Sequence, residues 1–158
     1  MASQSINLGL PDREAIPDAL YRSVVGLDAS DKEIFESAWH KDAIFIYNAP
    51  NASQTIEGLD AILGNTFAYI GLGLDTTHLV SNVRLDFKDG ADTAKVTSHA
   101  LAQHYRKGDG GNPKALRFLT GNMYWVDLAR DKSDGLWKMT RFEMKVIWCE
   151  GDASIVGQ

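Results

Sequence analysis

The chain has 158 residues, of which 44% are hydrophobic and 23% charged, and this is the composition of one ordinary globular domain. Its formal net charge is −5 with acidic and basic residues mixed along the chain, which argues against binding to nucleic acid or to an anionic membrane. The single cysteine, Cys149, excludes an intramolecular disulfide. Residues 1–10 lack the basic start and long apolar core of a secretion signal, so we expect a cytoplasmic protein.

No internal repeat or low-complexity linker divides the chain, which predicts a single domain. We expect residues 1–11 to form a flexible arm, residues 12–150 the domain and residues 151–158 a C-terminal tail. No apolar run approaches the length that a membrane-spanning helix needs.

Helices are predicted first along the chain. The periodicity of apolar residues favours one helix from residue 12 to about 27 and another from 59 to about 69. Between them, a short helix capped by Ser30 or Asp31 has an apolar side that ends at Trp39. The β-branched and aromatic residues 43–47 predict a strand.

The second half of the chain changes to the two-residue period of strands. Four long strands, each followed by a turn or loop, are predicted at 76–87, 93–106, 115–130 and 136–148. A sheet of strands this long must twist and coil. We therefore predict an α+β fold, in which a curved antiparallel β-sheet cone encloses a pocket with the N-terminal helices packed on its concave face.

Two strand faces indicate where a pocket wall lies. One face of the 93–106 strand carries small residues and ends in His104, which would leave room for a ligand, although close packing against a helix explains the pattern equally well. On the next strand, Thr120 and Asn122 are the only small polar residues of a mostly apolar face. Buried polar groups need partners, so these two side chains favour a wet or ligand-filled cavity.

The opposite sheet face is predicted to be apolar and to drive self-association. Its residues are Leu101, Tyr105, Leu119, Met123 and Trp125. A broad apolar face of this kind would otherwise be exposed, so we expect a homo-oligomer, either a dimer or a trimer.

The titratable residues favour acid–base chemistry. The histidines His40, His78, His99 and His104 show no metal-binding spacing, so no metal site is predicted. The chain also lacks a nucleophile elbow, a phosphate loop and a dinucleotide fingerprint. General acid–base catalysis needs none of these, and histidine suits it because its pKa lies near neutrality.

Asp28 and His78 are the candidate carboxylate–imidazole pair. Asp28 follows the first helix and His78 opens the first long strand, although a loop carboxylate and a surface histidine are the plain alternatives. A carboxylate beside an imidazole would fix its tautomer and raise its basicity. Strict alternation places His78 opposite the apolar residues of its strand. These residues are Leu79, Val83, Leu85 and Phe87. A bulge or the start of the strand could reverse this placement, but the pattern alone does not favour a pocket-facing His78.

Several segments in this order resemble the SnoaL-like family of nuclear-transport-factor-like cone folds. They are Trp39-His40-Lys41-Asp42-Ala43 with the strand after it, Ile56-Glu57-Gly58-Leu59-Asp60-Ala61-Ile62, and Thr77-His78. The likeness covers nearly the whole chain after residue 11, and within the superfamily it is strongest to scytalone dehydratases.

The resemblance implies a set of site residues. It makes Asp28 and His78 the catalytic pair, Tyr47 the group at the end of the early strand, and His104 a second catalytic histidine. It also implies that a polar pair binds the substrate. That pair is Thr120 and Asn122, with threonine in place of the family's serine. One departure is Leu27, which stands where the family has a second tyrosine, so the family's own substrate is not carried over.

The resulting expectation is a cofactor-independent dehydratase, isomerase or cyclase. It would act on a small hydrophobic oxygenated metabolite, such as a polyketide or terpenoid intermediate. His78, oriented by Asp28, would remove a proton next to a carbonyl that Tyr47 polarises, and His104 or His78 would protonate the leaving hydroxyl.

Two alternatives stay open at this stage. One is a non-catalytic ligand-binding or assembly module of the same fold. The other is an epoxide hydrolase, which would need Arg84 or Arg141 to point inward between carboxylates.

Overall fold

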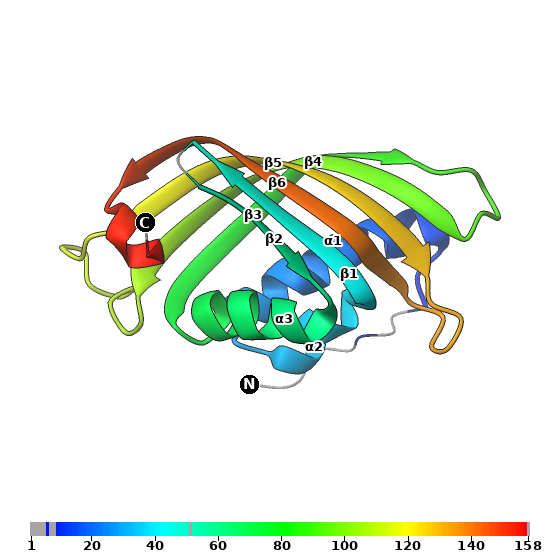
Figure 1. Cartoon of the computed structure of the whole chain (residues 1–158), viewed down its shortest axis with the longest axis horizontal. Coiled ribbons are helices and arrows are strands. Elements are labelled where there is room, and N and C mark those ends of the chain that lie inside the picture. Colours follow the sequence, from blue (N-terminus) through cyan, green and yellow to red (C-terminus); the bar gives the residue numbers. More distant parts are fainter. Residues whose placement is uncertain (1–5, 7–8, 51, 158) are drawn as a thin grey trace.

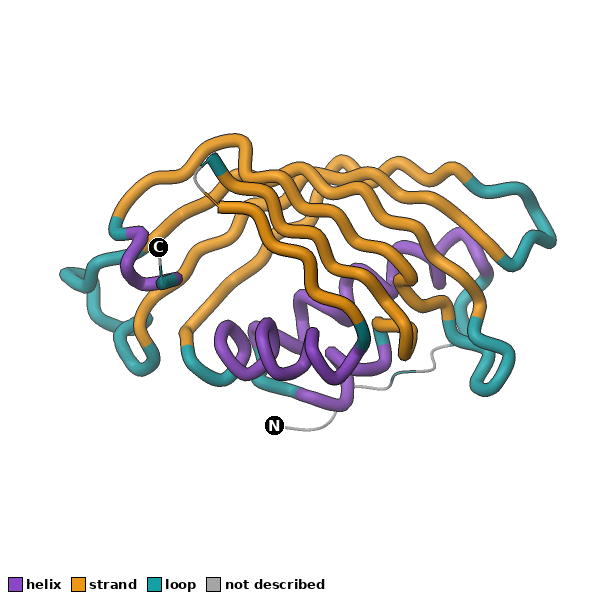
Figure 2. Tube along the Cα trace, viewed as in Figure 1, coloured by secondary structure: helices purple, strands orange, loops and turns teal. Residues whose placement is uncertain are grey.

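Six strands form one curved sheet, and the helices lie against its concave face (Figures 1 and 2). The computed structural model describes residue 6 and residues 9–50 and 52–157, so most of the predicted N-terminal arm lies outside the described residues. The helices are α1 (Asp12–Asp28), α2 (Lys32–Ser37) and α3 (Leu59–Ile62), which continues as a π-helical segment over Leu63–Gly71. The strands are β1 (Trp39–Ala49), β2 (Ala52–Glu57), β3 (Leu74–Asp86), β4 (Thr93–Arg106), β5 (Phe118–Arg130) and β6 (Trp137–Gly151). The predicted α+β cone is confirmed.

The sheet is mixed rather than purely antiparallel. Its strand order is β2-β1-β6-β5-β4-β3, and the four long strands β3 to β6 pair antiparallel as predicted. At the other edge, β1 pairs antiparallel with β2 but parallel with β6. The residue pattern of a strand does not identify the strand beside it, and the parallel pairing of β1 with β6 was therefore not predicted.

The short helix α2 ends before Trp39, so the predicted extension of this helix to Trp39 is wrong. Asp31 caps the helix by accepting a hydrogen bond from the Ile34 amide at 3.1 Å. At the other end the buried guanidinium of Arg22 donates to the Ser37 carbonyl oxygen at 2.5 Å, which satisfies a carbonyl at the helix end. Trp39 is the first residue of β1.

The third helix is widened into a π-helix after four residues, where a continuous α-helix was predicted. Besides Gly64, four residues of this segment line the cavity described below. They are Asn65, Thr66, Tyr69 and Ile70, spaced four to five residues apart as wide helical turns require.

A β-bulge in β3 reverses the alternation on which the interpretation of His78 rested. The β3–β4 register shifts between Ser81 and Arg84, and Asn82 within the bulge has a φ of 52°. Before the bulge His78 lines the interior while Leu79 is 61% exposed. After it, the other parity turns inward, and Val83, Leu85 and Phe87 pack on the core. The extra residue of a bulge has this effect, so strict alternation was wrong for β3.

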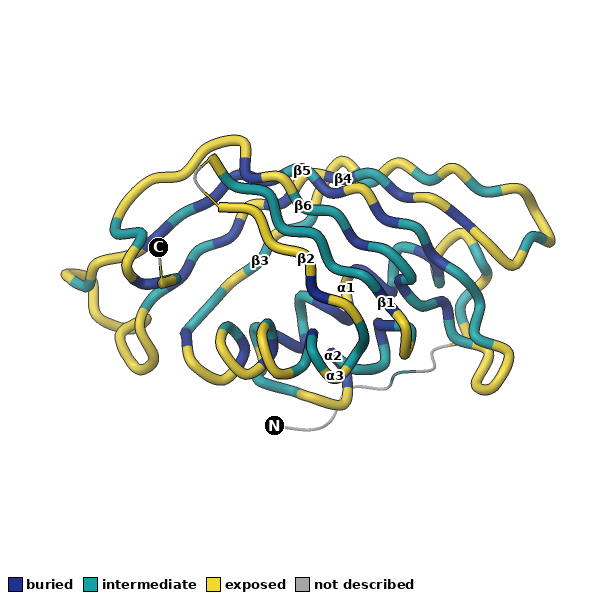
Figure 3. Tube along the Cα trace, in the orientation of Figure 1, coloured by how far each residue is buried: buried dark blue, intermediate teal, exposed yellow. Residues whose placement is uncertain are grey.

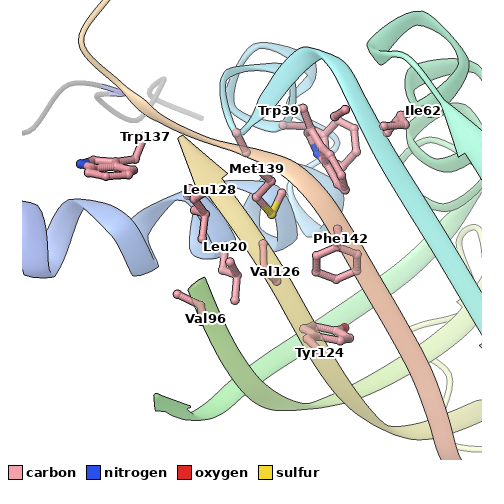
Figure 4. Close-up of a cluster of buried hydrophobic side chains, with 14 of the residues drawn as sticks. Leu20, Trp39, Ile62, Val96, Tyr124, Val126, Leu128, Trp137, Met139 and Phe142 are labelled. Atoms are coloured by element: carbon pink, nitrogen blue, oxygen red, sulfur yellow. The ribbon is translucent and has the colours of Figure 1, made fainter. Parts of the chain in front are cut away.

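The core fills the space between the helices and the concave sheet face (Figure 4). Buried positions recur along β4, β5 and β6, while the hairpin loops are exposed (Figure 3). On the convex face Leu101 and Trp125 are exposed, as expected for a surface available to another subunit, and the homo-oligomer stays a prediction. Within the described part of the chain, no helix combines the length and apolar character that crossing a membrane requires.

The segment after β6 is part of the fold. Residues Ala153–Val156 form a 3-10 turn, and Ile155 packs with Leu74 and Phe118 in a second small core. This turn brings Val156 to the cavity described below.

Gly26 sets the approach of α2 to the end of α1. A Cβ at this position would lie 2.5 Å from the backbone nitrogen of Phe35, a contact that only a backbone shift could relieve. Gly26→Ala should therefore lower the free energy of unfolding by about 1–3 kcal/mol, measured by urea denaturation.

Gly64→Ala is the matched control for this substitution. A Cβ there meets nothing within 4 Å and lies in a helix, so it should leave stability unchanged or slightly raised. Equal stability of the two variants would contradict the packing described here.

Candidate active site

A cavity of about 760 Å³ lies between the concave sheet face and the helices. All six candidate site residues except Asp28 line it, and Asp28 contacts it through His78. The volume falls in the range that encloses small-molecule ligands. The predicted pocket is therefore present.

Asp28 and His78 form the central hydrogen bond of the site. The Nδ1 atom of His78 lies 2.7 Å from Asp28 Oδ1, and Thr76 Oγ1 donates to the same oxygen at 2.8 Å. The backbone amide of His78 donates to the other carboxylate oxygen at 2.8 Å. Because a carboxylate accepts, the His78 proton sits on Nδ1 and leaves the Nε2 lone pair free.

The Asp28 carboxyl group is held in its charged form. Burial acts to raise its pKa, but the hydrogen bonds and charge of His78, together with the Thr76 hydroxyl, outweigh burial and set the pKa below its usual range. A charged Asp28 can stabilise an imidazolium when His78 takes up a proton.

The sheet register gathers the site residues in adjacent rows. His78 pairs with Ala102, which pairs with Thr120, so these three residues form one row across β3, β4 and β5. In the next row His104 pairs with Phe118, and its ring stands 5.7 Å from the His78 ring at 89°. The small side chain of Ala102 leaves open space between the polar groups.

His104 is a buried neutral histidine. Its Nδ1 atom lies 3.1 Å from the Phe118 carbonyl oxygen, which can only accept, so Nδ1 carries the proton and Nε2 is an acceptor. Burial, and next the charge of His78, lower the pKa of His104 from 6.5 to about 4. A histidine whose pKa is this low is neutral near pH 7 and carries no acidic proton on Nε2.

Thr120 and Asn122 are neighbours on the inner face of β5, and both line the cavity. Asn122 Nδ2 donates to Thr120 Oγ1 at 2.9 Å and to the Ala100 carbonyl oxygen at 3.3 Å. The carbonyl fixes the orientation of the amide, so Oδ1 is the remaining acceptor, and it is buried without a partner in the described part of the chain. A ligand hydroxyl would satisfy this oxygen.

Tyr47, Leu27 and Tyr124 also line the cavity. Leu27 is 7% exposed, so the departure from the family's tyrosine falls inside the site. Tyr124 was missed as a site residue, although it shares the inner face of β5 with Thr120 and Asn122. Burial, and then the Asp28 charge, raise the pKa of its phenol, so this group stays protonated and able to donate.

Other sequence candidates lie outside the cavity. His99 is exposed on the convex face, and neither Arg84 nor Arg141 is among the lining residues. Arg141 instead pairs with Glu143 at 2.6 Å. The inward arginine that an epoxide hydrolase would need is not found in the described lining. Nor do the described residues bring three metal-ligating side chains together.

Comparison with known proteins shows which family the chain belongs to. The chain is 38% identical over 154 residues to terrestric acid biosynthesis cluster protein E of Penicillium crustosum, covering 98% of this chain and 95% of that protein. A structure from Novosphingobium aromaticivorans, provisionally named a scytalone dehydratase, shares 24% identity, with 93% and 90% coverage and a TM-score of 0.71.

A hexachlorocyclohexane dehydrochlorinase of type 2 shares the fold as well, at 21% identity and a TM-score of 0.69, with 90% of each chain covered. Residues 9–143 match the SnoaL-like domain. With its curved sheet, inner cavity and this match over most of its length, the chain belongs to the SnoaL-like family.

Proposed function

We propose that the protein is a cofactor-independent acid–base enzyme, a dehydratase or isomerase, acting on a small hydrophobic oxygenated metabolite. The observation that carries this proposal is the 2.7 Å contact between Asp28 and His78 beside a cavity. The name of the Penicillium crustosum relative supports a place in secondary-metabolite biosynthesis. A passive binding module would not need a charged carboxylate held by three hydrogen bonds against an imidazole.

His78 is the proposed general base. Its free Nε2 takes a proton from a carbon next to the substrate carbonyl, and Asp28 stabilises the imidazolium that forms. The electron pair of the broken C–H bond moves into the new carbon–carbon double bond as the carbonyl oxygen gains negative charge. Tyr47 and Tyr124 line the same cavity and are the proposed phenols that polarise this oxygen, the second offsetting the tyrosine lost at Leu27.

The same imidazolium is the proposed acid of the second half-reaction. The His78 Nε2 proton passes to a hydroxyl on the adjacent carbon, which leaves as water, and His78 returns to its starting form. If no group leaves, the proton returns to another carbon and the outcome is isomerisation. Neutral His104, Thr120 and Asn122 are the proposed anchors of the substrate hydroxyls, with His104 Nε2 and Asn122 Oδ1 as acceptors.

Proton abstraction can be measured without the natural substrate. The wild-type protein should accelerate deuterium exchange at C2 of 1-tetralone in D₂O, followed by proton NMR. His78→Ala and Asp28→Asn should each reduce the protein-dependent rate by about a hundredfold or more, because general-base catalysis is lost.

His99→Ala, on the convex face, should exchange like the wild type and serves as the control. Exchange that is unaffected by loss of His78, or no acceleration by the wild type at all, would remove the support for this function.

The neutral state of His104 has a consequence for stability. Its folded pKa is about 4, below the ordinary value of 6.5, so the unfolded chain binds the proton first as the pH falls. The stabilisation is complete above pH 6.5 and is lost as the pH drops towards 4, by about 3 kcal/mol in total.

Urea denaturation of the wild type and of His104→Gln across this pH range tests the expected loss. The wild type should lose more stability on acidification than the variant, which lacks the titrating group, while His99→Gln should follow the wild type. Parallel curves for the wild type and His104→Gln would contradict a buried neutral His104.

A further inference from the structure

The cavity contains an aromatic cluster built around Trp39. The Trp39 ring lies 5.8 Å from Phe35, 6.0 Å from Phe45 and 5.7 Å from Phe142, and all four residues line the cavity. Phe142 in turn lies 4.7 Å from Tyr124. Figure 4 shows Phe142 between Trp39 and Tyr124. Tyr124 is the next buried residue after Asn122 on the inner face of β5, so the cluster adjoins the polar residues of that strand.

Trp39 carries a buried hydrogen-bond donor that none of the described groups accepts from. The residue is 3% exposed, and its Nε1 atom is one of three buried side-chain polar atoms without a partner among the described residues. An indole N–H can only donate, and the phenylalanine rings around it offer no oxygen. Buried donors in native proteins are nearly always paired, so an acceptor from a bound molecule is the natural complement.

The side chains that line the cavity also indicate what net charge a bound molecule carries. Among the described residues that line the cavity there is no lysine, arginine, aspartate or glutamate. The positive charge that His78 gains on protonation is already matched by Asp28, at 2.7 Å. A carboxylate or phosphate entering the cavity would therefore be buried without a counter-ion, which is strongly unfavourable.

We propose that the cavity selects a neutral molecule whose hydrogen-bond-accepting oxygen, a carbonyl, ester or ether, receives the N–H of Trp39. A neutral ligand of this kind is a narrower substrate class than the one proposed above. The inference rests on the proposed function only in placing the ligand in the same cavity. Of the three unpartnered atoms, the two that belong to lining residues then have opposite roles, since Asn122 Oδ1 takes a hydroxyl donor and Trp39 Nε1 takes an acceptor. The preferred ligand has a hydroxyl beside Thr120 and Asn122 and an acceptor oxygen among the aromatic rings around Trp39.

Three planar probes of nearly equal shape separate charge from hydrogen bonding. They are 2-acetylnaphthalene, which has an acceptor oxygen, 2-isopropenylnaphthalene, which replaces that oxygen by a methylene group, and the 2-naphthoate anion. Their dissociation constants for the wild-type protein are measured by calorimetry or by NMR titration. The anion should bind at least about a hundredfold more weakly than the ketone, because its charge is buried without compensation.

The Trp39 hydrogen bond is tested by comparing variants. Trp39→Phe should reduce the preference for the ketone over the hydrocarbon by roughly three- to tenfold, the contribution of one hydrogen bond. The control is Trp148→Phe, since Trp148 is 48% exposed and outside the cavity lining, and it should keep the wild-type preference.

A spectroscopic reading keeps the proposal testable if Trp39→Phe fails to fold. In the wild-type protein, labelled with ¹⁵N, the ketone should move the Trp39 indole proton downfield and the hydrocarbon should not. Equal affinity for anion and ketone, or an indole resonance that responds alike to ketone and hydrocarbon, would overturn the proposal. These outcomes concern binding alone, so they leave the role of His78 in proton exchange to be decided by its own variants.

Discussion

The carboxylate of Asp28 is the point on which the site depends. It joins the end of α1 to the start of β3 by accepting hydrogen bonds from the His78 ring, the His78 amide and the Thr76 hydroxyl. Three donors around one partly buried carboxylate keep it charged. The same contacts fix the proton of His78 on Nδ1, so one interaction sets the position, the tautomer and the chemistry of the imidazole.

The sheet carries the rest of the site to this pair. The bulge at Asn82 lets β3 turn His78 inward and still bury the apolar residues that follow it. Ala102 leaves space between His78 and Thr120, and Gly26 lets α2 pack against the last turns of α1. Polar groups at one wall and an aromatic cluster around Trp39 then give the cavity two chemically different regions.

The alternation of residues along a strand predicted which side chains face the cavity wherever the strand is regular. Alternation on regular strands placed His104, Thr120 and Asn122 on one inner surface, and the structure places all three in the cavity lining. Alternation failed on β3 because one extra residue at Asn82 changes the parity, and the residues around it do not reveal that change. Trp39 was assigned to a helix because its spacing fits one, while the carbonyl at the end of that helix is bonded by Arg22, a partner from α1 that local spacing does not reveal.

Contacts between residues far apart in the sequence could not be predicted from the periodicity of the sequence. Asp28 and His78 are fifty residues apart, and their proximity was expected only from the family resemblance. The parallel pairing of β1 with β6 is set by tertiary packing and has no local signature. Tyr124 could have been found, since it shares parity with Thr120 and Asn122, but a tyrosine on an apolar face is also ordinary core.

The central claim is that both histidines present an unprotonated Nε2 to the cavity, and long-range ¹H–¹⁵N NMR correlation at pH 8 tests it most directly. We expect that His78 and His104 each carry their proton on Nδ1, and that Asp28→Asn disturbs the tautomer of His78 while leaving that of His104 in place. A His78 that carries its proton on Nε2 in the wild-type protein would contradict its role as the general base.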